Sequence, residues 1–484
     1  MALFQQKKSD NFFFNSNTIV LILIFLTISR IFVLHISPLE LSVDEAQYWD
    51  WSQNLDWGYF SKPPLLAFLI RVVTELCGNG ENCIRSLSPF LHFLTSLIIF
   101  YSVYLLTKSF KKALLGSFLY LLMPGISFSS FLISTDVPLL LFSSLIALCI
   151  IKIFNSRKNT FLLFCLLGLF FALGFLSKYA IFYLLLSFLF STLIDKECRR
   201  FFFNKSFLFS IIIIVTLIFP NLIWNYNNEF VTLSHTASNA NLSHIKINIF
   251  QGITFLLSQI FIFGVIPFLY LSKKTLSLLS FNTIQKVFLI TFILPIFIVF
   301  LLAIFSRANA NWAVVGYPFA CILLPTLLNS KKKLLNNIFM LNQLTFSTII
   351  VISVFFLPIF NLDPFANIKH IKPLSNIIKN EITNRNNIAL MTDDREDYAQ
   401  LLYYLRNIDI KKAKWNGDIK IDDHYELTTD HNDLKGYDVL LITRTSPTPT
   451  MESKANSTEK VNSFYFKTNK RRKTFNLYIL KNWK

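Results

Sequence analysis

The sequence predicts a polytopic α-helical membrane protein that carries an α/β domain at its carboxyl end. Hydrophobic residues make up 53% of the 484 positions and charged residues only 15%, whereas soluble domains carry about 25% charged residues. From residue 361 onward, charged residues become frequent and the long apolar runs stop. We therefore expect a transmembrane domain over residues 1–360 and a compact extracytoplasmic α/β domain over residues 361–484.

About eleven apolar runs approach the length of roughly 20 residues with which a helix crosses a bilayer. They cover residues 18–36, 89–106, 113–131, 137–151, 160–176, 180–194, 206–223, 249–271, 287–304, 312–328 and 334–360. The first run is too long for the apolar part of a signal peptide and lacks a small-residue cleavage site. We therefore expect about 11 transmembrane helices, the first of which remains as an anchor.

The net charge of +18 follows the pattern of membrane topology. Short loops between alternate runs are rich in lysine and arginine, and such loops face the cytoplasm. The basic groups are Lys7-Lys8, Lys108 with Lys111-Lys112, Lys152 with Arg157-Lys158, Lys196 with Arg199-Arg200, Lys273-Lys274 and Lys331 to Lys333. We expect a multi-pass membrane protein with a cytoplasmic amino terminus and a carboxyl-terminal domain outside the cytoplasm, and no nucleic-acid partner. A lipid-surface role for the basic loops is the alternative.

The first exterior loop, residues 37–88, contains apolar stretches such as 65–70 that are too short to cross the membrane. They predict interfacial helices, one of which begins after Pro63-Pro64, because proline is tolerated in a first turn. Cys77 and Cys83 flank Gly78-Asn79-Gly80 in this loop. The two alternatives are a disulfide, which an oxidising compartment permits, and two separate thiols. A zinc site needs more ligands than this pair offers, and no metal is expected.

In the carboxyl-terminal domain, residues 394–406 have the periodicity of a helix. Residues 439–443 and 477–480 have the composition of short strands, and 446–450 that of a connecting loop.

Asp44 and Glu45 are the candidate catalytic residues of the first exterior loop. A carboxylate at this position can act as general base on an acceptor hydroxyl if it lies within hydrogen-bond reach. The alternative for Asp44 is structural, since aspartate is a preferred N-cap and a helix over 45–53 would begin directly after it.

Asp136 is a second exterior carboxylate, in the short turn Ser134-Thr135-Asp136-Val137-Pro138. Two carboxylates that face one cavity would suit an acceptor hydroxyl. Here too the alternative is an N-cap, since a proline follows closely. The loop 224–246 offers amide, aromatic and imidazole groups of the kind that bind sugars, including His235, which is otherwise an exposed loop residue.

Three exterior cations are candidates for binding a lipid phosphate: Lys62, Lys178 and Arg307. Lysine and arginine are uncommon at the exterior ends of spans, so Lys178 is a functional candidate by default. Arginine at an exterior turn can also stabilise a phosphate leaving group. The alternatives are a lysine that snorkels to the surface for Lys62 and an interface anchor for Arg307.

Together these motifs resemble the GT-C type, polyprenyl-phosphate-dependent glycosyltransferases, which include protein O-mannosyltransferases and the aminoarabinose transferases that modify lipid A. The motifs are Asp44-Glu45-Ala46-Gln47-Tyr48-Trp49, Lys62-Pro63-Pro64, Thr135-Asp136-Val137-Pro138, Ser177-Lys178-Tyr179, and Asn311-Trp312 with Tyr317-Pro318. The resemblance covers residues 44–318 and, in outline, the carboxyl-terminal domain. Each motif is weak alone, but their order and common membrane face are specific.

The resemblance implies a GT-C fold and assigns roles to residues. Asp44 is catalytic with Glu45 beside it, Asp136 is the second exterior aspartate, and Lys178 is the lysine after the fifth span. The family's Tyr-x-x-Lys-Pro element, whose lysine meets the lipid-linked phosphate, maps to Tyr59, Lys62 and Pro63, while Tyr48 and Tyr317 match aromatic positions. The sequence departs from the aminoarabinose transferases at Gln47, where they have arginine, and at Ser61, where they have an acidic residue.

We therefore expect a glycosyltransferase of the cell envelope that lies in the bacterial inner membrane, with its carboxyl-terminal domain in the periplasm. It would move a sugar, with inversion, from a polyprenyl (undecaprenyl) phosphate carrier to lipid A, a surface glycan or a protein, without a cofactor. The alternatives are a transporter or lipid flippase, and a glycan-binding subunit whose spans only anchor it. Transporters place ionisable residues near mid-membrane in repeated halves. In this sequence the ionisable residues gather at one surface, and the two halves show no repeat.

Overall fold

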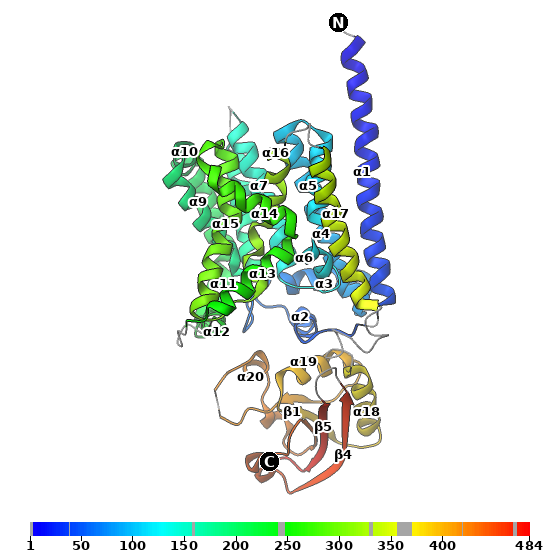
Figure 1. The fold of residues 1–484 in the computed structure, drawn as a ribbon. Coiled ribbons are helices and arrows are strands. Elements are labelled where there is room, and N and C mark those ends of the chain that lie inside the picture. The colour runs from blue at the N-terminus through cyan, green and yellow to red at the C-terminus, as the bar shows by residue number, and fades with distance from the viewer. Residues whose placement is uncertain are drawn as a thin grey trace. The chain divides into compact units, whose positions relative to one another are not determined.

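The computed structural model describes residues 3–37, 39–156, 160–240, 247–328, 333–355, 370–418, 420–467 and 472–484. The chain forms two compact units (Figure 1). The first comprises Met1–Ile36, Lys62–Leu66 and Asn82–Val351, and the second comprises Ser37–Ser61, Ala67–Glu81 and Ile352–Lys484. Most of the first exterior loop thus belongs to the same unit as the carboxyl-terminal residues. The functional division at residue 360 stays a prediction.

The first unit is helical. Its helices are α1 (Leu3–Ile36), α4 (Glu81–Thr107), α5 (Phe110–Leu121), α6 (Pro124–Ser129), α7 (Asp136–Asn155), α8 (Phe161–Ser177), α9 (Phe182–Ile194), α10 (Lys196–Phe202), α11 (Lys205–Asn227), α12 (Val231–Asn239), α13 (Ile249–Phe263), α14 (Val265–Lys274), α15 (Thr283–Phe305), α16 (Tyr317–Leu327) and α17 (Lys333–Phe355). Three 3-10 segments, η1 (Tyr179–Ile181), η2 (Thr275–Ser280) and η3 (Ala310–Gly316), connect some of them.

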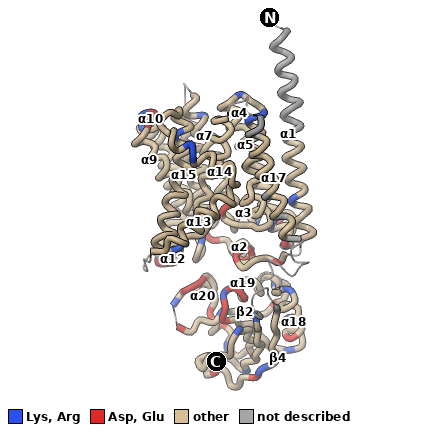
Figure 2. The backbone as a smooth tube through the Cα atoms, in the orientation of Figure 1, with Lys and Arg blue, Asp and Glu red and all other residues tan. Residues whose placement is uncertain are grey.

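Within the described ranges, five helical segments are long and apolar enough to cross a membrane, or six if the bent pair α13 and α14 forms one span. Three shorter apolar helices have 10–17 residues. Figure 2 shows these helices without charged residues over most of their length. The predicted polytopic helical membrane fold is confirmed, and the count of 11 spans stays a prediction.

Two of the predicted apolar runs are interrupted. In run 113–131, α5 ends at Leu121 and α6 begins at Pro124, and proline, which has no N–H, is favoured in the first turn of a new helix. In run 249–271, α13 and α14 meet at an angle of 111°. Gly264 lies at the bend with φ +108°, a conformation that residues with a Cβ rarely adopt.

The second unit combines helices with one sheet. Its elements are α2 (Val43–Gln53), most of α3 (Leu65–Cys77), α18 (Ile371–Thr383), β1 (Ile388–Thr392), α19 (Arg395–Tyr404), β2 (Lys412–Lys414), α20 (His424–Thr428), η6 (His431–Leu434), β3 (Asp438–Thr443), α21 (Pro449–Ser453), β4 (Ser457–Lys467) and β5 (Arg472–Lys481). The expected helix over 394–406 and the two expected strands are confirmed as α19, β3 and β5.

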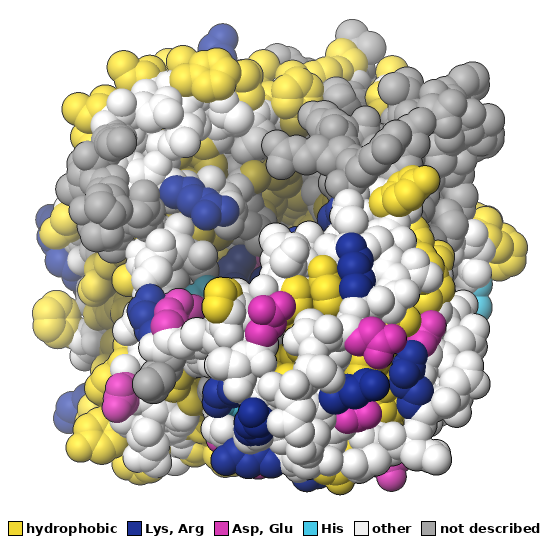
Figure 3. Space-filling model, turned by 90° about the horizontal axis from the view of Figure 1, so that it is seen from below, with side chains coloured by type: hydrophobic (Ala, Val, Ile, Leu, Met, Phe, Trp, Pro, Cys, Tyr) yellow, Lys and Arg dark blue, Asp and Glu magenta, His cyan; other side chains and the backbone are white. Residues whose placement is uncertain are grey.

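The sheet has the strand order β2-β1-β3-β5-β4. β1 pairs in parallel with β2 and β3, whereas β5 pairs antiparallel with β3 and β4. Alternate side chains of β1 enter different cores: Ile388 and Leu390 pack with α18 and α19, and Ala389 and Met391 pack with Trp415 and the segment around Trp483 on the other face. On the molecular face in Figure 3, acidic and basic side chains are interspersed.

Candidate functional site

Asp136 lies at the start of α7, and side chains from two other segments hold its carboxylate. Lys178, which follows α8, places its Nζ atom 2.6 Å from Asp136 Oδ1. Asn311, in η3, donates from Nδ2 to Asp136 Oδ2 at 2.6 Å. Asp136 is only 8% exposed, so its charge is stabilised by these two partners rather than by bulk water.

The N-cap alternative for Asp136 is wrong. Helix α7 begins with Asp136 itself, and its N-cap residue is Thr135, whose side chain makes no capping hydrogen bond. Both carboxylate oxygens instead bond side chains that lie 42 and 175 residues away in the sequence. The position of this carboxylate is therefore set by tertiary structure and not by helix capping.

A buried glutamine fixes the segment that carries Asn311. Gln259 of α13 donates from Nε2 to the carbonyl oxygen of Ala310 at 2.7 Å. The Tyr317 hydroxyl donates to Gln259 Oε1 at 2.6 Å. Gln259 and Tyr317 are both fully buried. Tyr317 thus acts in this structure as a support for η3, and through η3 for Asn311 and Asp136.

Asp44 and Glu45 have different environments in α2. Glu45 is buried and forms a capping box: its Oε2 accepts from the Ser42 amide at 2.9 Å, and the Ser42 hydroxyl accepts from the Glu45 amide at 3.4 Å. Asp44 is exposed in the first turn of the helix. The N-cap of α2 is Ser42, which caps the helix together with Glu45, so the capping alternative for Asp44 is also wrong.

Residues of the carboxyl-terminal segment hold α2 and its surroundings within the second unit. The Gln47 side chain, three residues after Asp44, accepts from Arg395 Nη1 of α19 at 2.8 Å. The Tyr404 hydroxyl accepts from the Leu41 amide at 2.8 Å, and Gln400 Nε2 donates to the Leu41 carbonyl at 2.7 Å. The segment that carries Asp44 is therefore positioned by helix α19.

An aromatic group surrounds the second half of α2. Trp51 stacks on Tyr59 with ring centroids 4.4 Å apart, and His424 of α20 meets both rings edge-on. The Tyr59 hydroxyl donates to the Trp51 carbonyl at 3.0 Å, and the ring of Tyr48 lies 5.4 Å from that of Trp51. Tyr48 and Tyr59 are buried, so both aromatic positions of the motif serve to pack this loop.

Burial changes the titration of two groups here. It raises the pKa of Asp50 to about 7, because a low-dielectric environment disfavours a charged carboxyl. It lowers the pKa of His424 to about 4, which keeps the imidazole neutral at physiological pH.

The remaining predicted site residues lie in the first unit, except Cys77, which lies in the second. Lys62 is half-buried in the segment Lys62–Leu66, and Arg307 is exposed four residues before Asn311. His235 lies in α12 with its Nε2 atom 2.8 Å from Asn239 Nδ2. Cys77 ends α3 and Cys83 lies in the first turn of α4; their pairing stays a prediction.

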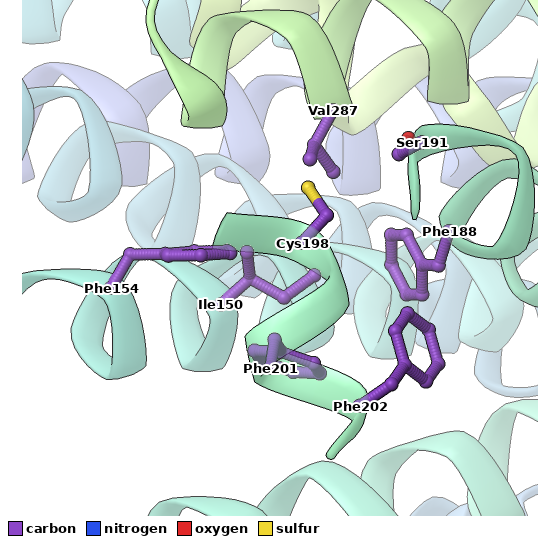
Figure 4. A pocket seen from close by; sticks show the side chains of 8 residues that line it. All are labelled: Ile150, Phe154, Phe188, Ser191, Cys198, Phe201, Phe202 and Val287. Atoms are coloured by element: carbon purple, nitrogen blue, oxygen red, sulfur yellow. The ribbon is translucent and has the colours of Figure 1, made fainter. Parts of the chain in front are cut away.

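Two cavities lie at the other end of α7. One is lined by Ile150, Phe154, Phe188, Ser191, Cys198, Phe201, Phe202 and Val287, which are mostly apolar (Figure 4). A larger one of about 600 Å³ is bordered by Asn155, Lys112 and the start of α15. Asp136 begins α7 and Asn155 ends it, so roughly 20 to 28 Å of helix separates the α7 residues that line these cavities from Asp136. No group of three or more potential metal ligands occurs among the residues that the structure describes.

The arrangement around Asp136 can accept a hydrogen bond from a hydroxyl group. Each carboxylate oxygen has a further lone pair beyond the one that Lys178 or Asn311 uses. The sequence assigned no role to three residues that surround Asp136 or the helix of Asp44. Asn311 lies in the motif Asn311-Trp312, whereas Gln259 and Arg395 belong to no motif.

Comparisons of the sequence with known proteins find glycosyltransferases. The family model described as dolichyl-phosphate-mannose-protein mannosyltransferase matches residues 61–224. The lipid A galacturonosyltransferase RgtD of Rhizobium johnstonii is 31% identical over 316 residues. That alignment covers 64% of this chain and 66% of the relative, slightly less than two thirds of its length.

Two crystal structures of ArnT from Cupriavidus metallidurans resemble the whole chain. The apo structure has a TM-score of 0.67 at 11% identity and covers 96% of this chain and 98% of its own. The structure bound to undecaprenyl phosphate has a TM-score of 0.64 at 12% identity, with 95% and 97% covered. The fold of this chain is therefore the fold of ArnT.

Proposed function

We propose that this chain, which by its fold is a member of the GT-C class of membrane glycosyltransferases, moves a sugar from a polyprenyl phosphate to a hydroxyl group of lipid A. The observation that carries the proposal is the carboxylate of Asp136, held at the start of α7 by Lys178 and Asn311. A buried ion pair contributes little to stability by itself, so we attribute a functional role to this one.

The reaction is a direct displacement with inversion. The acceptor oxygen forms a bond to the anomeric carbon of the sugar, and the bond from that carbon to the carrier phosphate oxygen breaks. The acceptor proton passes to a carboxylate, and the carrier leaves as a polyprenyl monophosphate. Asp44 is the proposed base because its carboxylate is exposed at the start of α2, and Asp136 orients the acceptor or the sugar.

The negative charge that develops on the leaving phosphate is the main electrostatic demand of this reaction. Lys62 and Arg307 are the proposed phosphate-binding cations. The charge of Lys178 is shared with Asp136 at 2.6 Å, so Lys178 contributes to the phosphate less than a solitary lysine would. The leaving group is already charged, and the reaction as written has no redox step and uses no cofactor.

The choice of substrates is supported by the relatives. One of the ArnT structures holds undecaprenyl phosphate, which supports a polyprenyl phosphate as the carrier. RgtD is named a lipid A galacturonosyltransferase, which supports lipid A over a protein or a surface glycan as the acceptor. The protein is proposed to lie in the bacterial inner membrane, with its amino terminus in the cytoplasm and residues 361–484 in the periplasm.

Transfer by purified protein in liposomes tests the proposal. The donor is a polyprenyl phosphate that carries a labelled sugar, the acceptor is lipid A, and mass spectrometry of the lipids detects the product. Wild-type protein is expected to add one sugar, and Asp44→Asn to abolish the addition. Glu75→Gln is the matched control, because Glu75 is an exposed carboxylate of the same loop that pairs with Arg71 on its own helix. Equal turnover by Asp44→Asn and wild type would exclude the mechanism.

A further inference from the structure

Arg395 brings a positive charge to the helix that carries Asp44. It is the first residue of α19, half-buried, and its Nη1 atom donates to Gln47 Oε1 of α2 at 2.8 Å. Gln47 follows Asp44 by three residues, and positions three apart are neighbours on a helix surface. The guanidinium group therefore lies about one helical turn from the exposed carboxylate of Asp44.

The acidic residues near Arg395 are occupied by a different arginine. Arg444 donates from Nε and Nη2 to the two oxygens of Asp397, at 2.9 and 2.7 Å. Its Nη2 atom also lies within 3.4 Å of Asp394 and Glu396. Across the described ranges of the chain, Arg395 has no carboxylate within ion-pair distance, and Gln47 is its one hydrogen-bond partner.

The free side of Arg395 suits an anion with two oxygens. A guanidinium carries five N–H donors in a planar fork, and Gln47 uses one of them. Such a fork binds a carboxylate or phosphate through two parallel hydrogen bonds, which an ammonium group cannot reproduce. A neutral amide such as Gln47 orients the fork without neutralising its charge.

We infer that Arg395 binds an anionic group of the lipid-linked donor and so places the sugar beside Asp44. The inference rests on the proposed function and deepens it. Two groups of the donor have the required pair of oxygens: the carrier phosphate, and the carboxylate of a uronosyl sugar. Helix α19 then contributes a substrate-binding residue to the active site in addition to holding α2.

Donor kinetics test the inference with two donors that differ only in the sugar. One is a polyprenyl phosphate that carries a uronosyl group, and the other carries the corresponding neutral hexosyl group. Arg395→Gln is expected to raise the KM for the donor about tenfold to a hundredfold, the range for hydrogen bonds to charged groups. A rise for both donors identifies the carrier phosphate as the bound group, and a rise for the uronosyl donor alone identifies the sugar carboxylate.

Arg395→Lys keeps the charge but removes the fork, so it is expected to recover only part of the donor affinity. Arg406→Gln is the matched control. Arg406 follows the same helix and lies over the Tyr403 ring at 4.3 Å, so it should leave the KM for both donors unchanged. Unchanged KM for both donors in Arg395→Gln would overturn the inference.

Gln47→Glu separates substrate binding from anchoring of α2. The new carboxylate would pair with Arg395 and occupy its fork. If Arg395 binds the donor, this variant raises the donor KM although its midpoint of thermal unfolding is not lowered. If Arg395 only anchors α2, the stronger contact leaves the donor KM unchanged, which contradicts the inference.

The two proposals fail in different ways. If wild-type protein transfers no sugar from either donor, the proposed function is wrong and the inference falls with it. If wild-type protein transfers sugar while Arg395→Gln and Gln47→Glu match Arg406→Gln in donor KM, the function stands and the inference alone is wrong.

Discussion

Two buried ion pairs occupy opposite ends of the helical unit, and they differ in what surrounds the carboxylate. Asp136 and Lys178 lie 2.6 Å apart with side chains 11% and 13% exposed. Asp195 and Lys286 lie 3.0 Å apart with side chains 9% and 17% exposed. The chain runs through α7, α8 and α9 between Asp136 and Asp195. An odd number of crossings places the two aspartates at opposite ends.

Helix capping explains Asp195 but not Asp136. Asp195 is the N-cap of α10, and its Oδ1 accepts from the Glu197 amide at 3.0 Å and from the Thr283 hydroxyl at 3.1 Å. Asp136 makes no capping bond, and its partners are side chains only. Similar burial and charge therefore occur in two settings: one pair completes a helix terminus, and we propose that the other keeps a carboxylate in position for a substrate.

Replacement of each aspartate is the strongest way to break this comparison. Asp136→Asn is expected to lower transfer by about a hundredfold to ten-thousandfold, the usual range for a lost proton-transfer or orienting carboxylate. Asp195→Asn is expected to lower thermal stability while the remaining folded protein retains its turnover. Initial rates per folded molecule, measured in liposomes, check both. Comparable loss of turnover in the two variants would remove the distinction.

Replacement of each lysine sharpens the comparison on stability. Lys178→Gln and Lys286→Gln each leave a buried carboxylate without its cation, which costs about 3 to 5 kcal/mol for fully buried pairs and less for these slightly exposed ones. Both variants should lower the midpoint of thermal unfolding by several degrees, and only Lys178→Gln should also lower turnover. A Lys178→Gln variant that turns over as fast as Lys286→Gln would show that the first pair is merely structural.

Asn311→Asp alters only the surroundings of Asp136. A carboxylate in place of the amide that donates to Asp136 removes one hydrogen bond and adds a like charge beside a buried carboxylate. Turnover should therefore fall about tenfold or more, because a lost hydrogen bond to a charged group costs roughly 1.5 to 3 kcal/mol. Asn309→Asp is the control, because Asn309 is exposed two residues earlier. Equal turnover by the two variants would argue against a role of Asn311 in holding Asp136.

Asp50 extends the comparison to a carboxyl that forms no ion pair with any residue that the structure describes, and the expected effect is the smallest. Its pKa is raised from 3.8 to about 7 by burial, so the folded protein keeps a proton that the unfolded chain loses near pH 4. This contribution to stability is full below pH 4 and is lost as the pH rises through 7. The midpoint of thermal unfolding should be a few degrees lower at pH 8 than at pH 5.

Asp50→Asn should remove most of that difference, whereas Asp56→Asn, a change at an exposed aspartate of the same loop, should not. If both variants keep the wild-type difference between pH 5 and pH 8, the proton is not held by Asp50.

Local patterns were enough to predict most helices and two strands. Apolar runs predicted α4, α7, α11 and α15, and the Pro63-Pro64 signal predicted α3. The breaks at Pro124 and Gly264 were not predicted, because an apolar run reports burial and length but not the direction of the chain. The capping roles of Asp44 and Asp136 were wrong for a related reason: a preferred residue type does not say which neighbour takes the role.

The candidate residues were predictable as types but not as partners. Asp136 and Lys178 were both identified as candidates from their expected exterior positions. Their ion pair was not predicted, because it joins residues 42 positions apart. Lys178 was instead predicted to bind only the lipid phosphate. The contact between Arg395 and Gln47 spans 348 positions. It places a guanidinium beside the position at which the sequence departs from the aminoarabinose transferases, and only tertiary structure could reveal it.

The proposed function requires that Asp44 and Asp136 lie on the same side of the membrane. Single cysteines at exposed positions can test this in spheroplasts, in a chain whose six native cysteines are replaced by serine. Cysteine at Glu75 reports on the loop of Asp44, cysteine at Asn309 on the segment beside Asp136, and cysteine at Glu197 on the opposite end. A membrane-impermeant maleimide should label the first two in intact spheroplasts, and the third only after permeabilisation. Labelling of positions 75 and 309 from opposite sides would contradict the account.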